Sequence, residues 1–208
     1  VEWDAKLKAN RWTCYEMYDK MMQKKAKRKN KFKPDPDIPL NMQTTQEDYS
    51  GSGFDRGHLC PSDDRCCSQA MNDQTFYLRK NLEEKVRAWA GKCDTLYVVK
   101  AATIDKAEYI CNKKDLNEIA EKEDKPAGSL HFPGIVPKYF YMALLAYDKK
   151  TNTYRALGIW SPHYKKSKYD YITIEELQKR TGIDFFCNLD DSIEKAVEAT
   201  VDSDYWEK

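Results

Sequence analysis

Residues 51–65 read GSGFDRGHLCPSDDR, and positions 55–58 of this stretch form the tetrapeptide Asp-Arg-Gly-His. Histidine is the side chain best suited to accept a proton from water near neutral pH, because its unperturbed pKa is about 6.5. Arginine presents a fixed fork of hydrogen-bond donors that matches a phosphate group. The neighbouring Arg56 and His58 therefore predict a site at which water attacks a phosphodiester bond.

Further along the chain, residues 82–90 (LEEKVRAWA) predict a helix, because apolar side chains recur at intervals of four and three residues. Glu83 and Arg87 are four residues apart, so they share one face of this helix. From spacing alone, an ordinary surface ion pair is the preferred interpretation of these two residues.

The rest of the chain mixes strands and helices without a regular strand-helix-strand alternation. Strands are predicted at residues 11–18, 54–59, 95–99, 139–147 and 154–160, and helices at residues 68–77, 82–90, 173–181 and 190–201. Gly182 predicts the end of the third of these helices, and residues 33–49, with three prolines, predict an extended loop. This mixture favours one α+β domain over residues 1–208, with a mixed, mainly antiparallel central sheet and flanking helices.

Composition bounds the function without identifying it. The 208 residues are 41% hydrophobic and 33% charged, which fits a globular chain with a real core. No apolar run approaches the roughly 18 residues of a membrane span. The net charge of +1 gives no argument for nucleic acid, but residues 24–33 form a dense basic run that contains Arg28. A solvated loop and a phosphate-attracting rim are equally good interpretations of this run, and Arg28 is its candidate phosphate contact.

The cysteines bear on the location of the protein. The seven are Cys14, Cys60, Cys66, Cys67, Cys93, Cys111 and Cys187. None has the spacing of a zinc or redox pair, and such a scattered set permits one or more disulfides in an oxidising compartment. With an N-terminus that looks processed, this favours a secreted or periplasmic protein, whereas buried reduced thiols are the alternative.

Several segments together resemble one family. The tetrapeptide at 55–58, its flanks at 48–51 and 59–62, and the Leu-Glu helix with an arginine four residues after the glutamate are similar to the DNA/RNA non-specific endonucleases. Segments within residues 97–104, 135–140 and 173–189 resemble the same family, so the likeness extends over roughly residues 11 to 200.

This resemblance implies a ββα-metal (His-Me finger) active site that hydrolyses DNA and RNA with little sequence preference. It implies Mg²⁺ as cofactor, with Mn²⁺ or another divalent cation as alternatives. It implies His58 as the general base, Arg56 and Arg87 as phosphate contacts, and Glu83 as support for the water shell of the metal. Arg56 could equally pair with a structural carboxylate, and Asp55 is expected to orient the turn.

The sequence departs from the family pattern between Leu78 and Arg79, where a segment with the expected metal-ligand asparagine is absent. The position of that asparagine relative to Glu83 falls on Thr75, and Asn81 is too close to the helix to replace it. Two explanations stay open. The sequence omits a loop at this point, which we favour because an isolated deletion beside an intact motif would be odd, or the deletion is real.

The second explanation leads to a rival function, a catalytically inactive nucleic-acid-binding domain of the same fold that has lost its metal ligand. A protein-binding domain without a nucleic-acid role is a further rival. The expected partners are DNA and RNA, with no membrane span, and the sequence makes no prediction of oligomeric state. Nothing in the chain resembles a groove-reading module such as a zinc finger.

Overall fold

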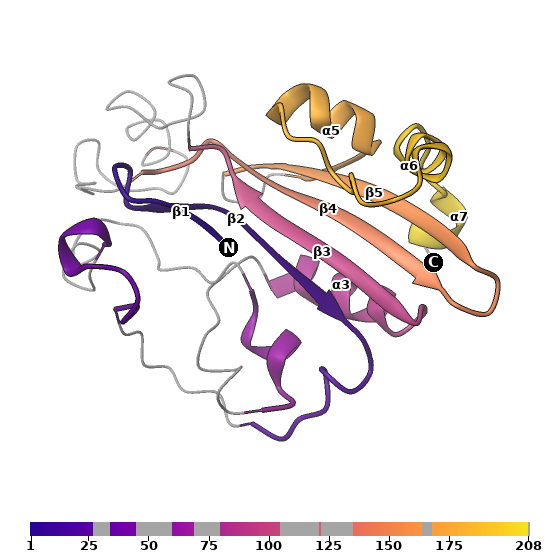
Figure 1. Ribbon diagram of the computed structural model, residues 1–208, viewed down its shortest axis with the longest axis horizontal. Helices are drawn as coiled ribbons and strands as arrows, with labels where there is room; N and C mark the ends of the chain where they lie inside the picture. Colours follow the sequence, from indigo (N-terminus) through magenta and orange to yellow (C-terminus); the bar gives the residue numbers. More distant parts are fainter. Residues whose placement is uncertain are drawn as a thin grey trace.

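The structure is a computed structural model, and it describes residues 1–26, 34–44, 60–68, 80–104, 121, 135–163 and 168–207. Its centre is a six-stranded sheet in the order β1-β2-β3-β4-β5-β6 (Figure 1). The strands are β1 (Glu2–Asp4), β2 (Ala9–Met17), β3 (Thr95–Ala102), β4 (Tyr139–Asp148), β5 (Thr153–Pro162) and β6 (Asp170–Ile172). Every strand pair described is antiparallel. The predicted α+β class is confirmed.

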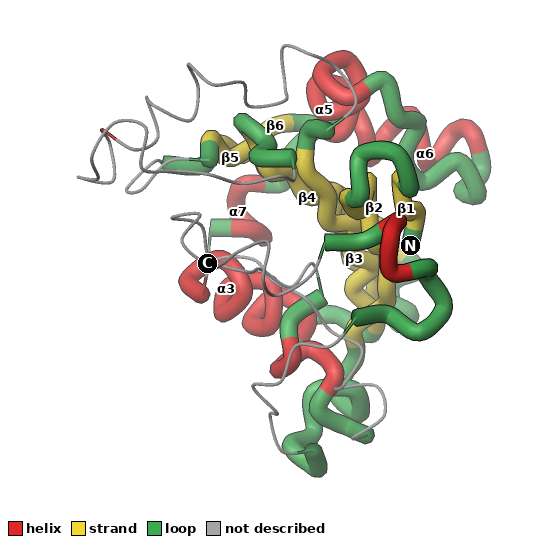
Figure 2. The backbone as a smooth tube through the Cα atoms, turned by 90° about the vertical axis from the view of Figure 1, so that its left-hand side faces the viewer, coloured by secondary structure: helices red, strands yellow, loops and turns green. Residues whose placement is uncertain are grey.

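Helices cover both sides of this sheet. They are η1 (Leu40–Met42), η2 (Ser62–Arg65), α3 (Lys80–Ala90), α5 (Ile174–Thr181), α6 (Asp191–Glu198) and α7 (Ser203–Trp206). Figure 2 shows α3 and α7 on one side of the strands and α5 and α6 on the other. We call these two sides the α3 face and the α5 face. No described helix is long and apolar enough to cross a membrane.

The β4–β5 hairpin follows from a polar turn between two apolar runs. Asp148 Oδ1 accepts hydrogen bonds from the backbone N–H groups of Lys150 and Thr151, at 2.9 and 3.1 Å. Asn152 takes a positive φ of 51°, which asparagine tolerates better than most residues. The strands pair from Asp148 with Thr153 outward, so the predicted pair is confirmed.

Helix α5 has the start and stop signals that the sequence predicts. The Thr173 hydroxyl accepts a hydrogen bond from the Glu176 N–H at 3.1 Å, which satisfies one of the free donors at the helix start. Gly182 takes a φ of 71° and donates its N–H to the Gln178 carbonyl at 2.7 Å. Only glycine adopts this conformation without strain, so the helix ends at Thr181.

Each face of the sheet has its own core. On the α3 face, Val86 and Trp89 of α3 pack with sheet residues such as Leu144, and the indole N–H of Trp89 donates to the Trp206 carbonyl at 3.0 Å. On the α5 face, Leu177 of α5 packs with aromatic sheet residues such as Trp160. The alternation of each strand therefore divides its side chains between two cores.

Other predicted elements have mixed outcomes. The strand at 11–18 is β2, the strand at 95–99 is the first part of β3, and the helix at 82–90 is α3. The helix at 190–201 is α6, which ends at Glu198 and is therefore shorter than predicted. A separate short helix that was not predicted, α7, follows Asp202, which caps it by accepting the Tyr205 N–H at 3.1 Å. The predicted strand at 54–59 and, apart from Ser68, the helix at 68–77 lie outside the described residues.

Candidate active site

The structure places two of the predicted site residues, Glu83 and Arg87, on α3. Both side chains are half-buried, whereas Glu84 between them is exposed. Arg28, Arg56 and His58 lie outside the described residues, as does the position Thr75. The roles predicted for all five site residues stay predictions.

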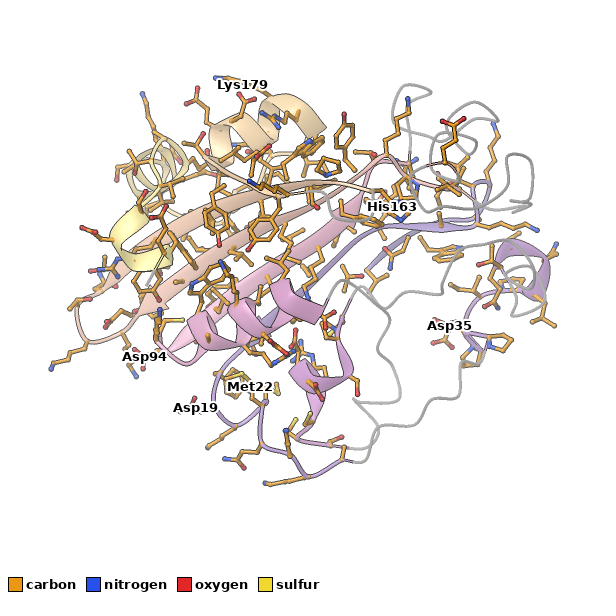
Figure 3. All side chains as sticks on the ribbon, turned by 180° about the vertical axis from the view of Figure 1, so that it is seen from behind. Asp19, Met22, Asp35, Asp94, His163 and Lys179 are labelled. Atoms are coloured by element: carbon orange, nitrogen blue, oxygen red, sulfur yellow. The ribbon has the colours of Figure 1, made fainter. Side chains whose placement is uncertain are left out.

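Arg87 contacts a carboxylate that the sequence analysis did not select. Its Nη1 donates to Asp64 Oδ1 at 3.2 Å, and the Asp64 side chain is 0% exposed. Asp64 belongs to η2, which follows Pro61. Figure 3 shows side chains filling the space between α3 and η2, with Met22 at its edge. A buried carboxylate requires compensation by charge and hydrogen bonds, so its other contacts matter.

The second oxygen of Asp64 contacts two strands of the sheet. The Tyr15 hydroxyl on β2 donates to Asp64 Oδ2 at 2.9 Å, and Lys100 Nζ on β3 lies 3.7 Å from the same oxygen. We call Tyr15, Asp64, Arg87 and Lys100 the Asp64 cluster. Two cations and one hydroxyl thus meet one carboxylate between α3, η2 and the sheet.

Lys100 is the most unusual member of this cluster. It continues the inward row of Leu96 and Val98 on β3, and its side chain is 0% exposed. Its Nζ has no hydrogen-bond partner among the described residues. Burial lowers the pKa of Lys100, while the nearby negative charges of Asp64 and, to a smaller extent, Glu83 oppose this shift. Glu83 therefore lies within electrostatic range of the cluster.

Two further groups titrate unusually beside Asp64. Burial, and then the negative charge of Asp64, raise the pKa of Tyr15 well above its usual range, so its hydroxyl stays a donor. Burial raises the pKa of the Cys60 thiol to about 11, and Arg65 opposes this shift. Cys60 follows His58 by two residues in the sequence. A residue close to the Asp-Arg-Gly-His tetrapeptide therefore lies within electrostatic range of Asp64 and Lys100.

The sequence held a signal for only one of the residues that were missed. A lysine within the apolar strand TLYVVKAA, in step with two inward-facing aliphatic residues, indicates a buried charge that needs a partner. Asp64 stands beside the equally acidic Asp63, and nothing in the sequence tells the buried residue from the exposed one. Tyr15 is one of 14 tyrosines and has no distinguishing pattern.

The carboxylates of this region limit how a metal could be held. Both oxygens of Asp64 already contact Arg87, Tyr15 and Lys100, whereas Glu83 is a second described carboxylate within electrostatic range of the cluster. Mg²⁺ prefers oxygen ligands and keeps several of its waters. One carboxylate beside the cluster fits a metal that is held largely through water.

An acidic group elsewhere has a different character. Carboxylate oxygens of Asp184, Glu194 and Glu198 lie within 4.8 Å of one another, on the side of α5 and α6. Gln178 donates to Glu198 Oε2 at 2.7 Å, and burial raises the pKa of Glu198. None of these residues was predicted as a site residue, and none belongs to the Asp64 cluster.

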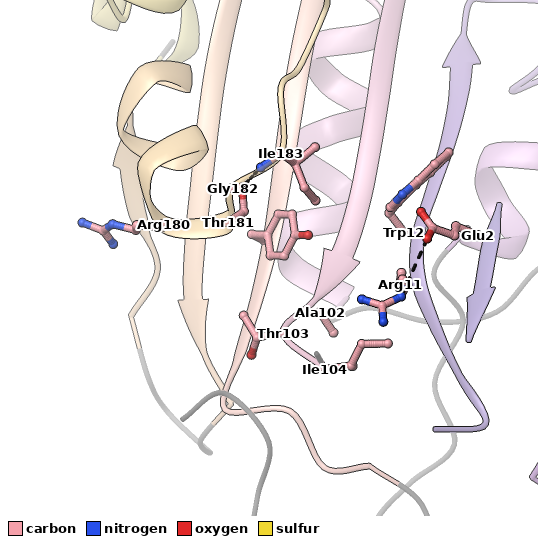
Figure 4. A pocket seen from close by; sticks show the side chains of 11 residues that line it. Glu2, Arg11, Trp12, Ala102, Thr103, Ile104, Arg180, Thr181, Gly182 and Ile183 are labelled. Atoms are coloured by element: carbon pink, nitrogen blue, oxygen red, sulfur yellow. Dashed lines mark hydrogen bonds and ion pairs between the residues drawn. The ribbon is translucent and has the colours of Figure 1, made fainter. Parts of the chain in front are cut away.

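A cavity of about 250 Å³ lies where the start of β2 and the end of β3 meet the C-terminal end of α5 (Figure 4). Arg11 and Trp12 line it from β2, and Gly182 and Ile183 line it from the α5 side. Arg11 is paired with Glu2 at 3.7 Å and with Asp4 at 2.6 Å. Neither Glu83 nor Arg87, the two predicted site residues that the structure describes, lines this cavity.

The described cysteines do not form disulfides with one another. The thiols outside any disulfide are those of Cys14, Cys60, Cys66, Cys67, Cys93 and Cys187, and Cys111 lies outside the described residues. Cys67 Sγ instead contacts Met21 Sδ at 3.5 Å. The six thiols therefore give no support to the expected oxidising compartment.

Comparison with known proteins extends the resemblance seen in the sequence. The model of the DNA/RNA non-specific endonuclease family matches residues 1–192. The protein named "Nuclease EXOG, mitochondrial" from Xenopus laevis is 28% identical over 180 positions, covering 77% of this chain and 48% of that protein. The protein named "Nuclease" from Nostoc sp. is 27% identical over 198 positions, covering 86% of this chain and 67% of that protein.

A shorter and closer match concerns one segment. "Nuclease C1" from Cunninghamella echinulata is 57% identical over 49 residues, which are 24% of this chain and 19% of that protein. The chain spans about half the length of several curated relatives that it matches, among them the frog protein and the human "Nuclease EXOG, mitochondrial". Because the family model covers nearly all of the 208 residues, this chain belongs to the DNA/RNA non-specific endonuclease family.

Proposed function

We propose that this protein is a metal-dependent endonuclease that hydrolyses phosphodiester bonds of DNA and RNA with little sequence preference. The observation that carries the proposal is that the family-type Glu83 and Arg87 lie four residues apart on α3, beside a carboxylate that follows the Asp-Arg-Gly-His segment and contacts Arg87. Family membership and the names of the relatives support the same activity.

The residues of this chain divide the chemistry among them. His58 in its neutral form accepts a proton from the attacking water. The Arg87 guanidinium has five N–H donors, and only part of this set contacts Asp64, so other donors remain for phosphate oxygens. Arg56 is a second phosphate contact, and Arg28 in the basic run is a third. Contacts to phosphate without contacts to bases give affinity without sequence preference.

Glu83 is the residue expected to support a divalent metal, with Mg²⁺ as the first candidate and Mn²⁺ as the alternative. Such an ion, when bound, stabilises the negative charge that develops on the phosphate and on the leaving oxygen. Glu83 would hold it through water, and an asparagine would supply the direct protein ligand that the family implies. That asparagine is expected in a segment between Leu78 and Arg79.

The alignment to the Xenopus laevis relative includes positions that have no counterpart in this chain. It has 180 positions but covers only 77% of the 208 residues, so it contains gaps opposite this chain. The intact mass of the expressed protein tests the point directly. A mass well above 24.4 kDa would show additional residues, whereas a mass of 24.4 kDa together with no stimulation by Mg²⁺ would favour the inactive binding domain.

The general base is tested by plasmid nicking with His58→Ala, in Mg²⁺ and in EDTA. We expect a loss of about 10²–10⁴-fold in rate with little change in DNA binding. His163→Ala is the matched histidine control, because the His163 ring contacts the Pro137 carbonyl at 2.9 Å and packs on Phe140 and was not predicted as a site residue. Nicking by the His58 variant at the parental rate would exclude His58 as the base.

The pH profile gives a second test of the same residue. A base must be neutral to accept a proton, so the rate should fall on acidification through about 6.5, the unperturbed pKa of histidine. A rate that is constant well below this pH would contradict the assignment.

The helix register is tested by two neighbouring substitutions. Glu83→Ala should lower activity and raise the Mg²⁺ concentration needed for half-maximal rate. Glu84→Ala should leave both unchanged, because this exposed side chain is turned about 100° around the helix from Glu83. Equal losses at both positions would contradict the role of Glu83.

Secretion or periplasmic location stays a proposal that rests on the family resemblance. A count of free thiols under denaturing conditions without reductant tests its physical part. Seven free thiols would leave no disulfide for an oxidising compartment to form.

A further inference from the structure

The contacts of Asp64 point in two directions. Oδ1 contacts Arg87 on α3, a residue whose side chain is 22% exposed, while Oδ2 contacts Tyr15 and Lys100 on the sheet. The carboxylate itself has no contact with solvent. It therefore connects a solvent-accessible arginine to two adjacent strands of the core.

We propose that Asp64, anchored by Tyr15 and Lys100, is a positioning residue that sets the orientation of the Arg87 guanidinium for a phosphate group. This inference rests on the proposed nuclease function. It adds to that function a residue that does not touch the substrate and acts only through Arg87.

The need for such a residue follows from the flexibility of arginine. A long exposed arginine loses substantial rotamer freedom when it is held against a ligand. A guanidinium that is already oriented before the substrate binds avoids part of this loss. Asp64 can provide that orientation because its own position is fixed by a hydroxyl from β2 and an ammonium group from β3.

The charges of the cluster explain why Lys100 belongs to it. A carboxylate that contacted Arg87 alone would cancel the positive charge that Arg87 needs for phosphate. Lys100 lies 3.7 Å from Asp64 and offsets its charge from the far side. With Lys100 protonated, two cations of the Asp64 cluster face one carboxylate, and Arg87 is the cation that solvent can reach.

A double-mutant cycle tests the proposal on the full chain with plasmid DNA and Mg²⁺. Asp64→Asn alone should lower kcat/KM by about 10- to 100-fold, the usual effect of losing a group that orients another. In an Arg87→Ala background, the same substitution should change kcat/KM by less than about 2-fold, because the residue through which it acts is gone. Asp63→Asn, the exposed neighbour on η2, is the matched control and should leave activity unchanged.

A milder variant keeps the test decisive if Asp64→Asn does not fold. Tyr15→Phe removes one hydroxyl that donates to Asp64 Oδ2 and leaves every charge of the cluster in place. It should lower kcat/KM by about 3- to 10-fold, the effect of one lost hydrogen bond, and this loss should also disappear in the Arg87→Ala background.

The outcomes separate the inference from the proposed function. If Arg87→Ala loses activity but Asp64→Asn or Tyr15→Phe has its full effect in both backgrounds, Asp64 does not act through Arg87 and the inference is wrong. If Arg87→Ala keeps full activity, the phosphate role of Arg87 is wrong and the inference falls with it. If His58→Ala also keeps full activity, the proposed function itself fails.

Discussion

The two faces of the sheet differ in whether they bury charged residues. On the α3 face, Asp64 and Lys100 are fully buried charged residues that adjoin the apolar core. On the α5 face, the buried core of the described chain is aliphatic and aromatic, with Leu177 and Trp160 among its members, and contains no charged residue. One sheet therefore separates a core with internal charge from a core without it.

This difference indicates where function constrains the sequence. A buried ion pair is often no more stabilising than apolar residues of the same volume, so packing alone does not require Asp64 and Lys100. The α5 face shows that this chain can build a neutral core. The charged core lies beside Glu83 and Arg87, the two described residues for which the family resemblance implies a catalytic role.

Among the variants that distinguish the two faces, Lys100→Met is expected to lower the free energy of unfolding the most. Removal of the ammonium group leaves the fully buried Asp64 short of one compensating charge, and breaking a buried pair in this way costs about 3–5 kcal/mol in the free energy of unfolding. Urea denaturation followed by circular dichroism measures this loss. Adding Asp64→Asn to the variant should recover part of the stability, because both charges are then absent; no recovery would contradict the pairing.

Leu177→Ala is the corresponding core substitution on the α5 face. Leu177 is 0% exposed, so its truncation should cost about 2–5 kcal/mol through lost burial and an unfilled cavity. Nicking activity per folded molecule should stay at the parental value, because both described site residues, Glu83 and Arg87, lie on α3 at the opposite face. A loss of activity that exceeds the loss of folded protein would mean that the two faces are coupled.

Gly158→Ala tests how closely the backbone at the end of β6 packs against β5 on the α5 face. A Cβ at this position of β5 would lie 2.9 Å from the Ile172 carbonyl oxygen and 3.0 Å from that of Thr173. Backbone atoms cannot yield cheaply, so we expect a loss of about 1–3 kcal/mol in denaturant unfolding. Gly91→Ala is the matched control, since its nearest contact would be an ordinary 3.4 Å; equal stability of both variants would contradict the close packing of β6 on β5.

The smallest expected effect concerns the reactivity of the Cys60 thiol, which lies near Asp64 on the α3 face. Its pKa is raised from 9.0 to about 11, and only the thiolate reacts with iodoacetamide. At pH 8 it should react about 100-fold more slowly than an ordinary thiol, and mass spectrometry can compare it with the exposed Cys14 and Cys187. Equal reaction rates would contradict the raised pKa of Cys60.

The same raised pKa predicts alkaline destabilisation. The folded state favours the protonated thiol, so its contribution to stability is complete below about pH 9 and is lost as the pH rises through about 11. Cys60→Ser should flatten the dependence of the unfolding free energy on pH between about pH 9 and 11. The slope of this dependence around pH 7 should stay the same.

The sequence predicted the long elements of the fold better than the short ones. Strands β2, β4 and β5 and helices α3 and α5 have enough periodicity, or clear enough caps, to be recognised. Strands β1 and β6 have three residues each and show no period at that length. They exist because neighbouring strands offer free hydrogen-bonding edges, which is a tertiary effect.

The candidate site was predictable only in part. The family resemblance selected Glu83 and Arg87, which the structure brings to one side of α3. It did not select Asp64, because the distinction between Asp63 and Asp64 depends on how η2 is oriented against the sheet. Periodicity could have selected Lys100 as a buried charge, but its partner is 36 residues away in sequence and could not be inferred from spacing.

The strand order also bears on when the site comes into existence during folding. Strands β4 and β5 join through a tight turn and require little chain closure, whereas β2 reaches β3 only after residues 18–94 have closed into one loop. Closing a loop of this length costs conformational entropy, and this cost slows folding. Asp64 and Arg87 lie inside that loop, and Tyr15 and Lys100 lie on the two strands that close it. A chain that has assembled only β3 to β6 therefore lacks the Asp64 cluster, so hydrolytic activity is expected only from molecules that have completed folding.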